Sequence, residues 1–190
     1  MEFKLKPINV KTLPDNVFKL LDNDWMLVTA GNKESFNTMT ASWGAFGILW
    51  NKPIAIGFIR PQRYTFEFAN KFDYFTLSFF IEKYRDALNY IGGNSGRRVD
   101  KISKTGLTPL ITEHGNIYFS EARLVMECKK LYSDDIKANN LVLTNLIKDI
   151  YPSGDFHRFF IGEIIHCLST DTTLPEKDIK LEEREENDWP

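Results

Sequence analysis

Residues 37–72 read NTMTASWGAFGILWNKPIAIGFIRPQRYTFEFANKF, and they carry the most informative pattern of the chain. Small hydroxyl residues precede a tryptophan, an apolar run follows at 53–59, and Arg60 and Arg63 then stand on either side of a Pro-Gln pair. The apolar run, bounded by prolines, is typical of a buried strand. A helical apolar stripe follows Thr65. The stretch therefore predicts a strand that leads through a basic loop into a helix.

Strand patterns also dominate the rest of the chain. Apolar runs occupy 25–31 and 74–81, apolar and polar residues alternate over 121–128, and a long apolar segment at 156–168 bends at Gly162. In the alternating segment we place Ala122, Leu124, Met126 and Cys128 on one face and Glu121, Arg123 and Glu127 on the other.

Helices are fewer and shorter. We expect them near 15–22, over 84–91 before the Gly-Gly pair, and over 143–150 before a proline. Because the strands follow one another without regular helices between them, parallel winding is disfavoured. The pattern favours a β-rich α+β fold, a closed or partly closed antiparallel barrel with peripheral helices.

Composition narrows the class of protein. The chain has 190 residues, 43% of them hydrophobic, and a net charge of −2, which fits one globular domain with no general attraction to nucleic acid or anionic membranes. No apolar run reaches the ~20 residues of a membrane span. Cys128 and Cys167 lie in strand patterns, so we expect buried thiols and a cytoplasmic protein. We expect a single domain over 1–175 and a charged tail over 176–190.

The usual catalytic motifs are missing from the sequence. Neither a dinucleotide-binding glycine motif nor a P-loop is present, and His114, His157 and His166 lie far apart along the chain. We therefore expect no metal site and name no catalytic residue.

An anion site is the chemistry that remains. Arg60, Arg63, Tyr64 and Thr65 cluster where a helix opens, so two guanidinium groups, a hydroxyl and free helix N–H groups could hold a phosphomonoester. Lys101 lies in a second basic segment at 97–104 and could assist. Solvated arginines, with Thr65 as a helix cap and 97–104 as an exposed turn, are the alternative.

One further segment is suited to a flat ring, and a second could line a site. At Thr40, Ala41 and Ser42 the side chains are small enough to let a ring approach the backbone, although an ordinary strand end would look the same. His157 stands beside aromatic residues, where a packed histidine is the common case.

The order of these pieces resembles the FMN-binding split-barrel family of flavin reductase-like proteins, with the flavoredoxin-like branch as the closest match. The resemblance rests on NTMTASWG, RPQRYTFEF, FTLSFF, SGRRVDKISKTGL and FHRFFIGEI, and it spans about residues 25–168. It implies an antiparallel split β-barrel that forms a homodimer and binds FMN. Arg98 departs from the pattern, since many relatives carry an acidic residue there.

The resemblance also implies a set of cofactor-binding residues. The isoalloxazine ring would lie along Met39, Thr40, Ala41, Ser42 and Trp43; the phosphate would be held by Arg60, Arg63, Tyr64 and Thr65, with help from Lys101; and His157 would lie near the ring or the nicotinamide.

The implied activity is hydride transfer from NADH or NADPH to FMN and onward to a second acceptor. One alternative is an FMN-containing electron carrier that exchanges electrons with a protein and does not use NAD(P)H. Another is a non-enzymatic barrel that binds an anion or nucleic acid through its basic segments.

Overall fold

The computed structural model describes residues 4–170, so the expected domain boundary at 175 and the tail at 176–190 lie outside the described residues and stay predictions. The strands are β1 Lys6–Pro7, β2 Met26–Gly31, β3 Phe36–Ala41, β4 Gly44–Leu49, β5 Lys52–Ile59, β6 Tyr74–Phe79, β7 Pro109–Ile111, β8 Ile117–Phe119, β9 Leu124–Asp135 and β10 Arg158–Ser169. The α-helices are α1 Tyr64–Lys71, α2 Arg85–Gly93, α3 Lys101–Thr105 and α4 Asn145–Asp149; a π-helix spans Lys19–Asp24, and short 3-10 turns lie at Val10–Thr12, Glu82–Tyr84 and Ala138–Asn140.

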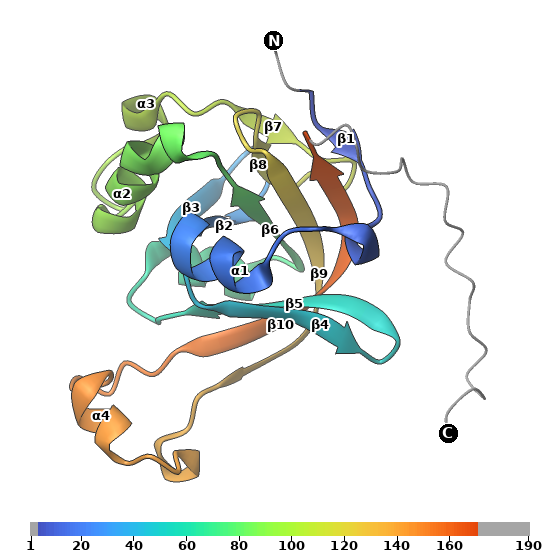
Figure 1. The fold of residues 1–190 in the computed structure, drawn as a ribbon. Coiled ribbons are helices and arrows are strands. Elements are labelled where there is room, and N and C mark those ends of the chain that lie inside the picture. The colour runs from blue at the N-terminus through green and yellow to red at the C-terminus, as the bar shows by residue number, and fades with distance from the viewer. Residues whose placement is uncertain (1–3, 171–190) are drawn as a thin grey trace.

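The strands form a strongly coiled antiparallel sheet. Its order is β3-β2-β6-β9-β10-β5-β4, with β1 added to β10, while β7 and β8 form a separate hairpin. All the described strand pairs are antiparallel. Figure 1 shows the sheet wrapped around the core, with α2 and α3 (green) side by side at its rim. The predicted β-rich antiparallel split barrel is therefore confirmed.

Both faces of the central strands are buried, which explains their nearly continuous apolar sequences. Met26 and Val28 of β2 point into the barrel core, whereas Leu27 between them packs in a second cluster beneath α2 and β8. On β9, Met126 and Val125 divide between the two clusters in the same way. A strand whose side chains alternate between two apolar layers needs no polar face.

The glycine in the last strand allows the bend expected there. A Cβ atom at Gly162 would lie 2.7 Å from the Phe75 ring and 2.8 Å from the Cys128 Cβ atom. The register between β9 and β10 also shifts at Ile161/Gly162. Only glycine lets the strand pass this close to its neighbours, so the bend predicted at Gly162 is confirmed. Cys128 and Cys167 are free and buried, also as predicted.

One strand begins later than its sequence pattern suggests. β9 begins at Leu124, and Glu121–Ala122 belong to the preceding turn. Ala122 packs in the cluster beneath α2 and not with Leu124 and Met126, so its expected face was wrong. The pleat that makes side chains alternate exists only where the backbone is extended, and the turn ends it.

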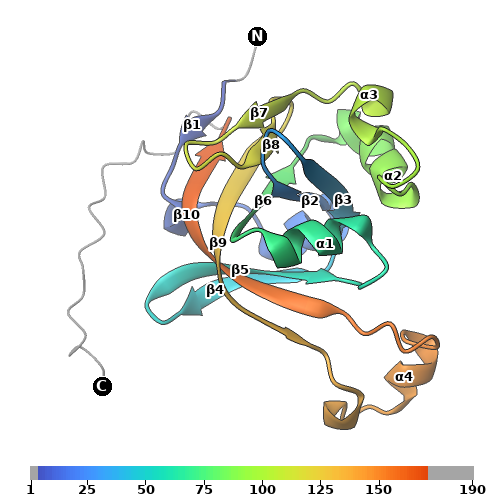
Figure 2. The same cartoon turned by 180° about the vertical axis from the view of Figure 1, so that it is seen from behind.

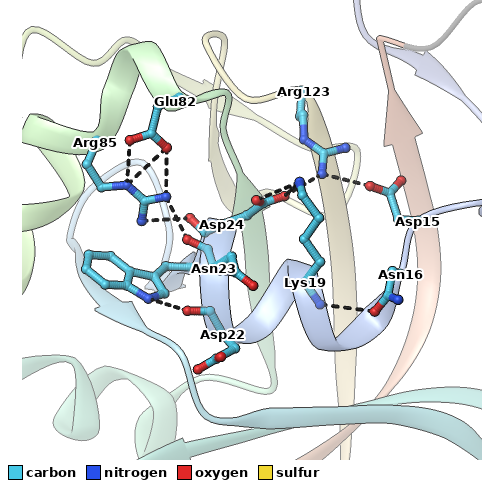
Figure 3. A network of polar contacts seen from close by, with 10 residues as sticks. Asp15, Asn16, Lys19, Asp22, Asn23, Asp24, Glu82, Arg85 and Arg123 are labelled. Atoms are coloured by element: carbon cyan, nitrogen blue, oxygen red, sulfur yellow. Dashed lines mark hydrogen bonds and ion pairs between the residues drawn. The ribbon is translucent and has the colours of Figure 1, made fainter.

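The N-terminal helical segment is held by a charged network (Figure 3). The guanidinium of Arg123 donates to Asp15 at 2.7 Å and to Asp24 at 2.9 Å, and Lys19 also bonds the Asp24 carboxylate. Arg85 donates to the Asn23 carbonyl and pairs with Glu82. These contacts fix the wide π-helical turn, which lacks a side-chain cap of its own.

The outer halves of β9 and β10 extend away from the barrel as an arm. The segment between them, residues 136–157, carries α4, which lies to one side of the barrel in both views (Figures 1 and 2). Val142 and Leu143 on this arm are exposed. Among the helices within residues 4–170, none is long and apolar enough to cross a membrane.

Candidate functional site

The start of α1 opens onto a cavity of about 320 Å³. Residues of β3, α1, α2, α3 and the loops next to them line it: Met39, Gln62, Arg63, Tyr64, Thr65, Gly93, Asn94, Ser95, Arg97, Arg98 and Lys101. Five of the residues expected to bind a cofactor therefore meet here, namely Met39, Arg63, Tyr64, Thr65 and Lys101.

The helix end that faces this cavity has no protein cap. Arg63 occupies the cap position, and its side chain makes no capping hydrogen bond. Within residues 4–170, no acceptor is recorded for the backbone N–H of Tyr64 or Thr65. Such N–H groups, together with the helix dipole, favour an anion. Thr65 is not the helix cap considered from the sequence, because it lies inside the first turn.

Thr65 is instead built into the wall of the cavity. It is fully buried, and its hydroxyl oxygen accepts a hydrogen bond of 2.7 Å from the Asn37 side-chain amide. The hydroxyl proton has no recorded acceptor within the described residues, so it remains available to a ligand. Asn37 was not among the expected site residues, although it lies only two residues before Met39, which was.

The charges around the cavity are of one sign. Arg63, Arg97, Arg98 and Lys101 line it, and none of its lining residues within the described chain is acidic. Burial, with Arg60 nearby, lowers the pKa of the Arg63 guanidinium, yet arginine stays charged at neutral pH. Arg97 also pairs with Glu67 and lies 4.7 Å from the centre of the Tyr64 ring. The cavity thus presents a concentrated positive field.

Lys101 links two walls of the cavity by hydrogen bonds and has one N–H donor of its ammonium group left. Its ammonium group donates to the Thr38 carbonyl at 2.9 Å and to the Ile91 carbonyl at 3.0 Å, which joins β3 to the end of α2. Burial and the charge of Arg63 lower the pKa of Lys101 to about 8. An ammonium has three donors, so one remains for a bound anion.

The turn at 94–98 completes the cavity: Arg97 and Arg98 belong to the basic segment considered from the sequence, whereas Asn94 and Ser95 were not expected there. The position of the turn depends on Gly96, where a Cβ atom would lie 2.1 Å from the Asn37 Oδ1 atom and 3.2 Å from the Tyr64 ring. The run GGNSGRR therefore serves here to bring a turn close to α1, although its spacing fits no phosphate-binding motif.

A second, aromatic hollow lies beside Ser42 and Trp43. It measures about 460 Å³ and is lined by Phe18, Leu21, Asp22, Ser42, Trp43, Gly44, Phe58, Ile136 and Tyr151. Trp43 contacts His157 at 5.0 Å between ring centres. The His157 Nδ1 atom lies 3.0 Å from the Tyr151 hydroxyl. Burial and the charge of Arg60 lower the pKa of His157 to about 4, so the ring is neutral at pH 7.

The remaining expected residues lie elsewhere around these two hollows. Arg60 bonds Asp155 at 2.5 Å and the Ile150 carbonyl at 2.9 Å, which anchors the arm instead of lining the cationic cavity. Thr40 donates its hydroxyl to the Leu88 carbonyl, and Ala41 packs against the barrel core. The eleven expected residues thus divide between a cationic cavity, an aromatic hollow and structural contacts, and their role in binding a cofactor stays a prediction.

Comparison with known proteins agrees with this fold. A family model described as a flavin reductase like domain matches residues 20–178. Among curated proteins, no relative matches the chain.

Solved structures give three informative likenesses. An FMN-binding protein from Thermus thermophilus with bound 1-cyclohex-2-enone is 21% identical, with 86% of this chain and 79% of that chain covered and a TM-score of 0.64. The flavoredoxin of Desulfovibrio vulgaris (Miyazaki F) is 25% identical, with coverage of 81% and 73% and a TM-score of 0.60. An NADH:FAD oxidoreductase from Streptomyces globisporus C-1027, in complex with NAD and FAD fragments, is 16% identical, with coverage of 76% and 73% and a TM-score of 0.57. Because the family model matches most of the length of this chain, the chain belongs to the flavin reductase-like family.

Proposed function

We propose that this protein binds FMN and acts as a flavin reductase-like oxidoreductase with NADH or NADPH as its reductant. The observation that carries the proposal is the uncapped start of α1, which opens onto a cavity lined by four cationic side chains and no recorded carboxylate. A phosphomonoester supplies the negative charge and the acceptor oxygens that this arrangement lacks.

Each part of the cofactor has residues that suit it. Arg63, Lys101 and the N–H groups of Tyr64 and Thr65 would hold the phosphate. The isoalloxazine ring would lie against the 39–43 segment, because β3 pairs only with β2 among the described strands and its other edge is not covered by a strand. Trp43 and His157 would then border the ring or the nicotinamide, with neutral His157 as a hydrogen-bonding partner.

When bound, FMN would supply the redox chemistry by accepting a hydride and passing the electrons to a second acceptor. The protein would position the partners, exclude water through the aromatic hollow and provide donors at fixed points. The name of the Streptomyces relative, an NADH:FAD oxidoreductase, supports a nicotinamide reductant. Flavoredoxins stand among the similar structures as well, so an electron carrier that uses no NAD(P)H is the alternative.

The visible spectrum of the purified protein, recorded before and after gel filtration with added FMN, tests the proposal. We expect a retained oxidised-flavin spectrum that NADH or NADPH bleaches under anaerobic conditions. A retained flavin that neither nucleotide bleaches would favour the electron carrier. A protein that neither retains FMN nor reduces it would refute both the reductase and the electron carrier.

A single substitution tests the phosphate site itself. Arg63→Ala should weaken FMN binding by roughly 10- to 150-fold, because a hydrogen bond to a charged group contributes about 1.5–3 kcal/mol. Lys33→Ala, at an exposed position away from the cavity, is the matched control. Binding of riboflavin, which lacks the phosphate, should change little in Arg63→Ala.

We also propose a homodimer in the cytoplasm. Phe18, Trp43, Ile48 and Trp50 are exposed apolar side chains around the aromatic hollow and strand β4, and a second copy would cover them. The two free, buried thiols suit a reducing compartment. In the electron-carrier alternative, a protein electron acceptor would approach from the side left open by this dimer.

A further inference from the structure

Away from the proposed flavin site, three metal-binding side chains meet where the β7–β8 hairpin lies against the sheet. Glu127 lies on β9, and His166 lies opposite it in the register on β10. His114 comes from the turn between β7 and β8 and reaches the same carboxylate. The two imidazole rings lie 5.1 Å apart between their centres. The fold thus unites two histidines that the sequence keeps far apart.

We propose that His114, Glu127 and His166 form a binding site for a divalent transition-metal ion, with Zn²⁺ as the best fit. The Nδ1 atom of His166 lies 3.0 Å and that of His114 3.3 Å from the Glu127 Oε2 atom. All three ligand atoms lie within 4.8 Å of one another. Metal–ligand bonds of about 2.0–2.2 Å in a tetrahedral arrangement place ligand atoms roughly 3.3 Å apart. Binding would therefore need little movement.

The carboxylate is already oriented for this role. Its other oxygen, Oε1, accepts hydrogen bonds from the Thr112 hydroxyl and, at 2.6 Å, from the Asn116 side-chain amide. Oε2 is left to the two imidazoles. Outer hydrogen bonds that fix a ligand's orientation are a regular feature of metal sites.

The turn that carries His114 is built around the same carboxylate. The Thr112 N–H donates to the Asn116 carbonyl at 2.8 Å, and the Asn116 N–H donates to the Thr112 hydroxyl at 3.0 Å. Gly115 closes the turn in a left-handed conformation, with φ of 81°. His114 is therefore held in place before any ion arrives, which lowers the entropic cost of binding.

Burial and charge point to a cation. The Glu127 side chain is 1% exposed, and its recorded ion-pair partners within residues 4–170 are the two histidines alone. The neighbours that bond Oε1 are neutral, so neutral imidazoles would leave the buried negative charge uncompensated. A divalent ion between the three ligands would supply that charge.

The site also has an open side. The side chains of His114 and His166 are 39% and 31% exposed, and His114 lines a cavity of about 380 Å³ together with Tyr74 and Asn116. Three protein ligands with one open position are typical of zinc sites that bind water or a small anion as the fourth ligand. Two imidazoles and a carboxylate also suit Fe²⁺, and the test distinguishes the two ions.

Metal analysis and Zn²⁺ titration of tag-free protein test the proposal. We expect one Zn²⁺ per chain in a calorimetric titration and about ten-fold or greater loss of affinity in His114→Gln and in His166→Gln, since each removes a ligand. His157→Gln, which replaces the third histidine of the chain, should bind Zn²⁺ as the wild type does. Tighter binding of Fe²⁺ than of Zn²⁺ under anaerobic conditions would keep the site and change its ion.

A second measurement guards against variants that fail to fold. Zn²⁺ should raise the unfolding temperature of the wild type and of His157→Gln, and it should leave that of a folded His114→Gln/His166→Gln protein unchanged. The proposal would be overturned if the double variant bound Zn²⁺ as tightly as the wild type does, and Fe²⁺ as tightly as the wild type does. The cluster would then be a buried carboxylate hydrogen-bonded by two imidazoles. Neither result depends on FMN binding, so the two proposals fail separately.

Discussion

Lys101 is the residue whose protonation controls the charge of the proposed phosphate site. Burial and the neighbouring Arg63 lower its pKa to about 8, whereas the arginines stay charged far above that pH. Below pH 8 the ammonium adds one positive charge to the cavity, and above pH 8 this charge is lost. The phosphate of FMN is already dianionic above pH 7, so its own charge stays constant.

We therefore predict that FMN affinity falls as the pH rises from about 7.5 to 9.5. In Lys101→Gln the affinity should be lower at pH 7 and nearly independent of pH over the same range. Quenching of FMN fluorescence, titrated at each pH, measures both. A wild-type affinity that stays flat to pH 9.5 would remove Lys101 from the phosphate site.

The partners of single charged residues could not be predicted from the sequence. Alternation placed Glu127 on the side of its strand opposite to Met126 and Cys128, but it did not show that the β7–β8 hairpin would cover this carboxylate and bury it. Arg60 and Arg63 look equivalent in the sequence, yet Asp155 on the arm engages one and leaves the other to the cavity. These partners are set by tertiary contacts between distant segments, which neither spacing nor periodicity encodes.

At the scale of elements, the turn at 94–98 depends on the absence of a side chain at Gly96. A methyl group there would meet the Asn37 amide, which is itself bonded to Thr65, so the turn would have to move away from α1. We predict that Gly96→Ala weakens FMN binding about ten-fold or more, the loss of one charge-assisted contact. Gly47→Ala, where a Cβ atom meets nothing within 4 Å, should bind FMN normally. Fluorescence titration of both variants measures this, and equal affinities would contradict it.

The π-helix at 19–24 depends on Arg123 (Figure 3), which bonds Asp15 and Asp24 from the start of β9. Arg123→Gln should lower the free energy of unfolding by about 1–3 kcal/mol, because two partly buried carboxylates lose a charged partner. Lys33→Ala, which breaks an exposed pair of 3.8 Å, should cost less than about 1 kcal/mol. Urea unfolding at pH 7 compares them, and equal losses would contradict the prediction.

The stability that this network contributes depends on pH through the Asp24 carboxylate. Burial raises the pKa of Asp24, but hydrogen bonds from Lys19 and Arg123 outweigh burial and lower it below 3.8. The stabilisation by this carboxylate is therefore present above pH 3.8 and is lost as the pH falls through the lowered pKa. In Arg123→Gln the loss between pH 5 and pH 3 should be smaller than in the wild type.

For the whole molecule, the barrel could be predicted because each strand has a recognisable apolar pattern within its own sequence. The runs at 53–59 and 74–81 begin and end close to β5 and β6, and the helix expected at 84–91 became α2. The helix expected near 15–22 is a π-helix at Lys19–Asp24. Its π-helical form could not be predicted locally, because it depends on Arg85 and Arg123 from other elements. Patterns within ten residues specify elements, whereas the arm and the two hollows arise only from how the elements meet.

The β4–β5 hairpin offers a test of the proposed dimer. Trp50 and Asn51 form its two-residue turn, with φ of 49° and 57°. Asparagine tolerates this left-handed region, but a bulky aromatic residue there is strained, and the side chain of Trp50 is 55% exposed. A strained and exposed tryptophan gains nothing in an isolated chain. Contact with a second copy would offset the strain, and it would also cover Ile48, which is exposed near the same end of β4.

We predict that Trp50→Gly weakens dimerisation at least ten-fold without lowering the stability of the single chain. Glycine relieves the left-handed strain at the turn, while the loss of the indole removes apolar area from the interface. Ile111→Ser, which changes an equally exposed residue on β7, should leave association unchanged. Sedimentation equilibrium over a range of protein concentrations, with circular dichroism melting at the lowest, separates the two effects. If the wild type is monomeric throughout, or if Trp50→Gly associates as tightly as Ile111→Ser, the strained tryptophan serves another purpose and the hairpin is not the interface.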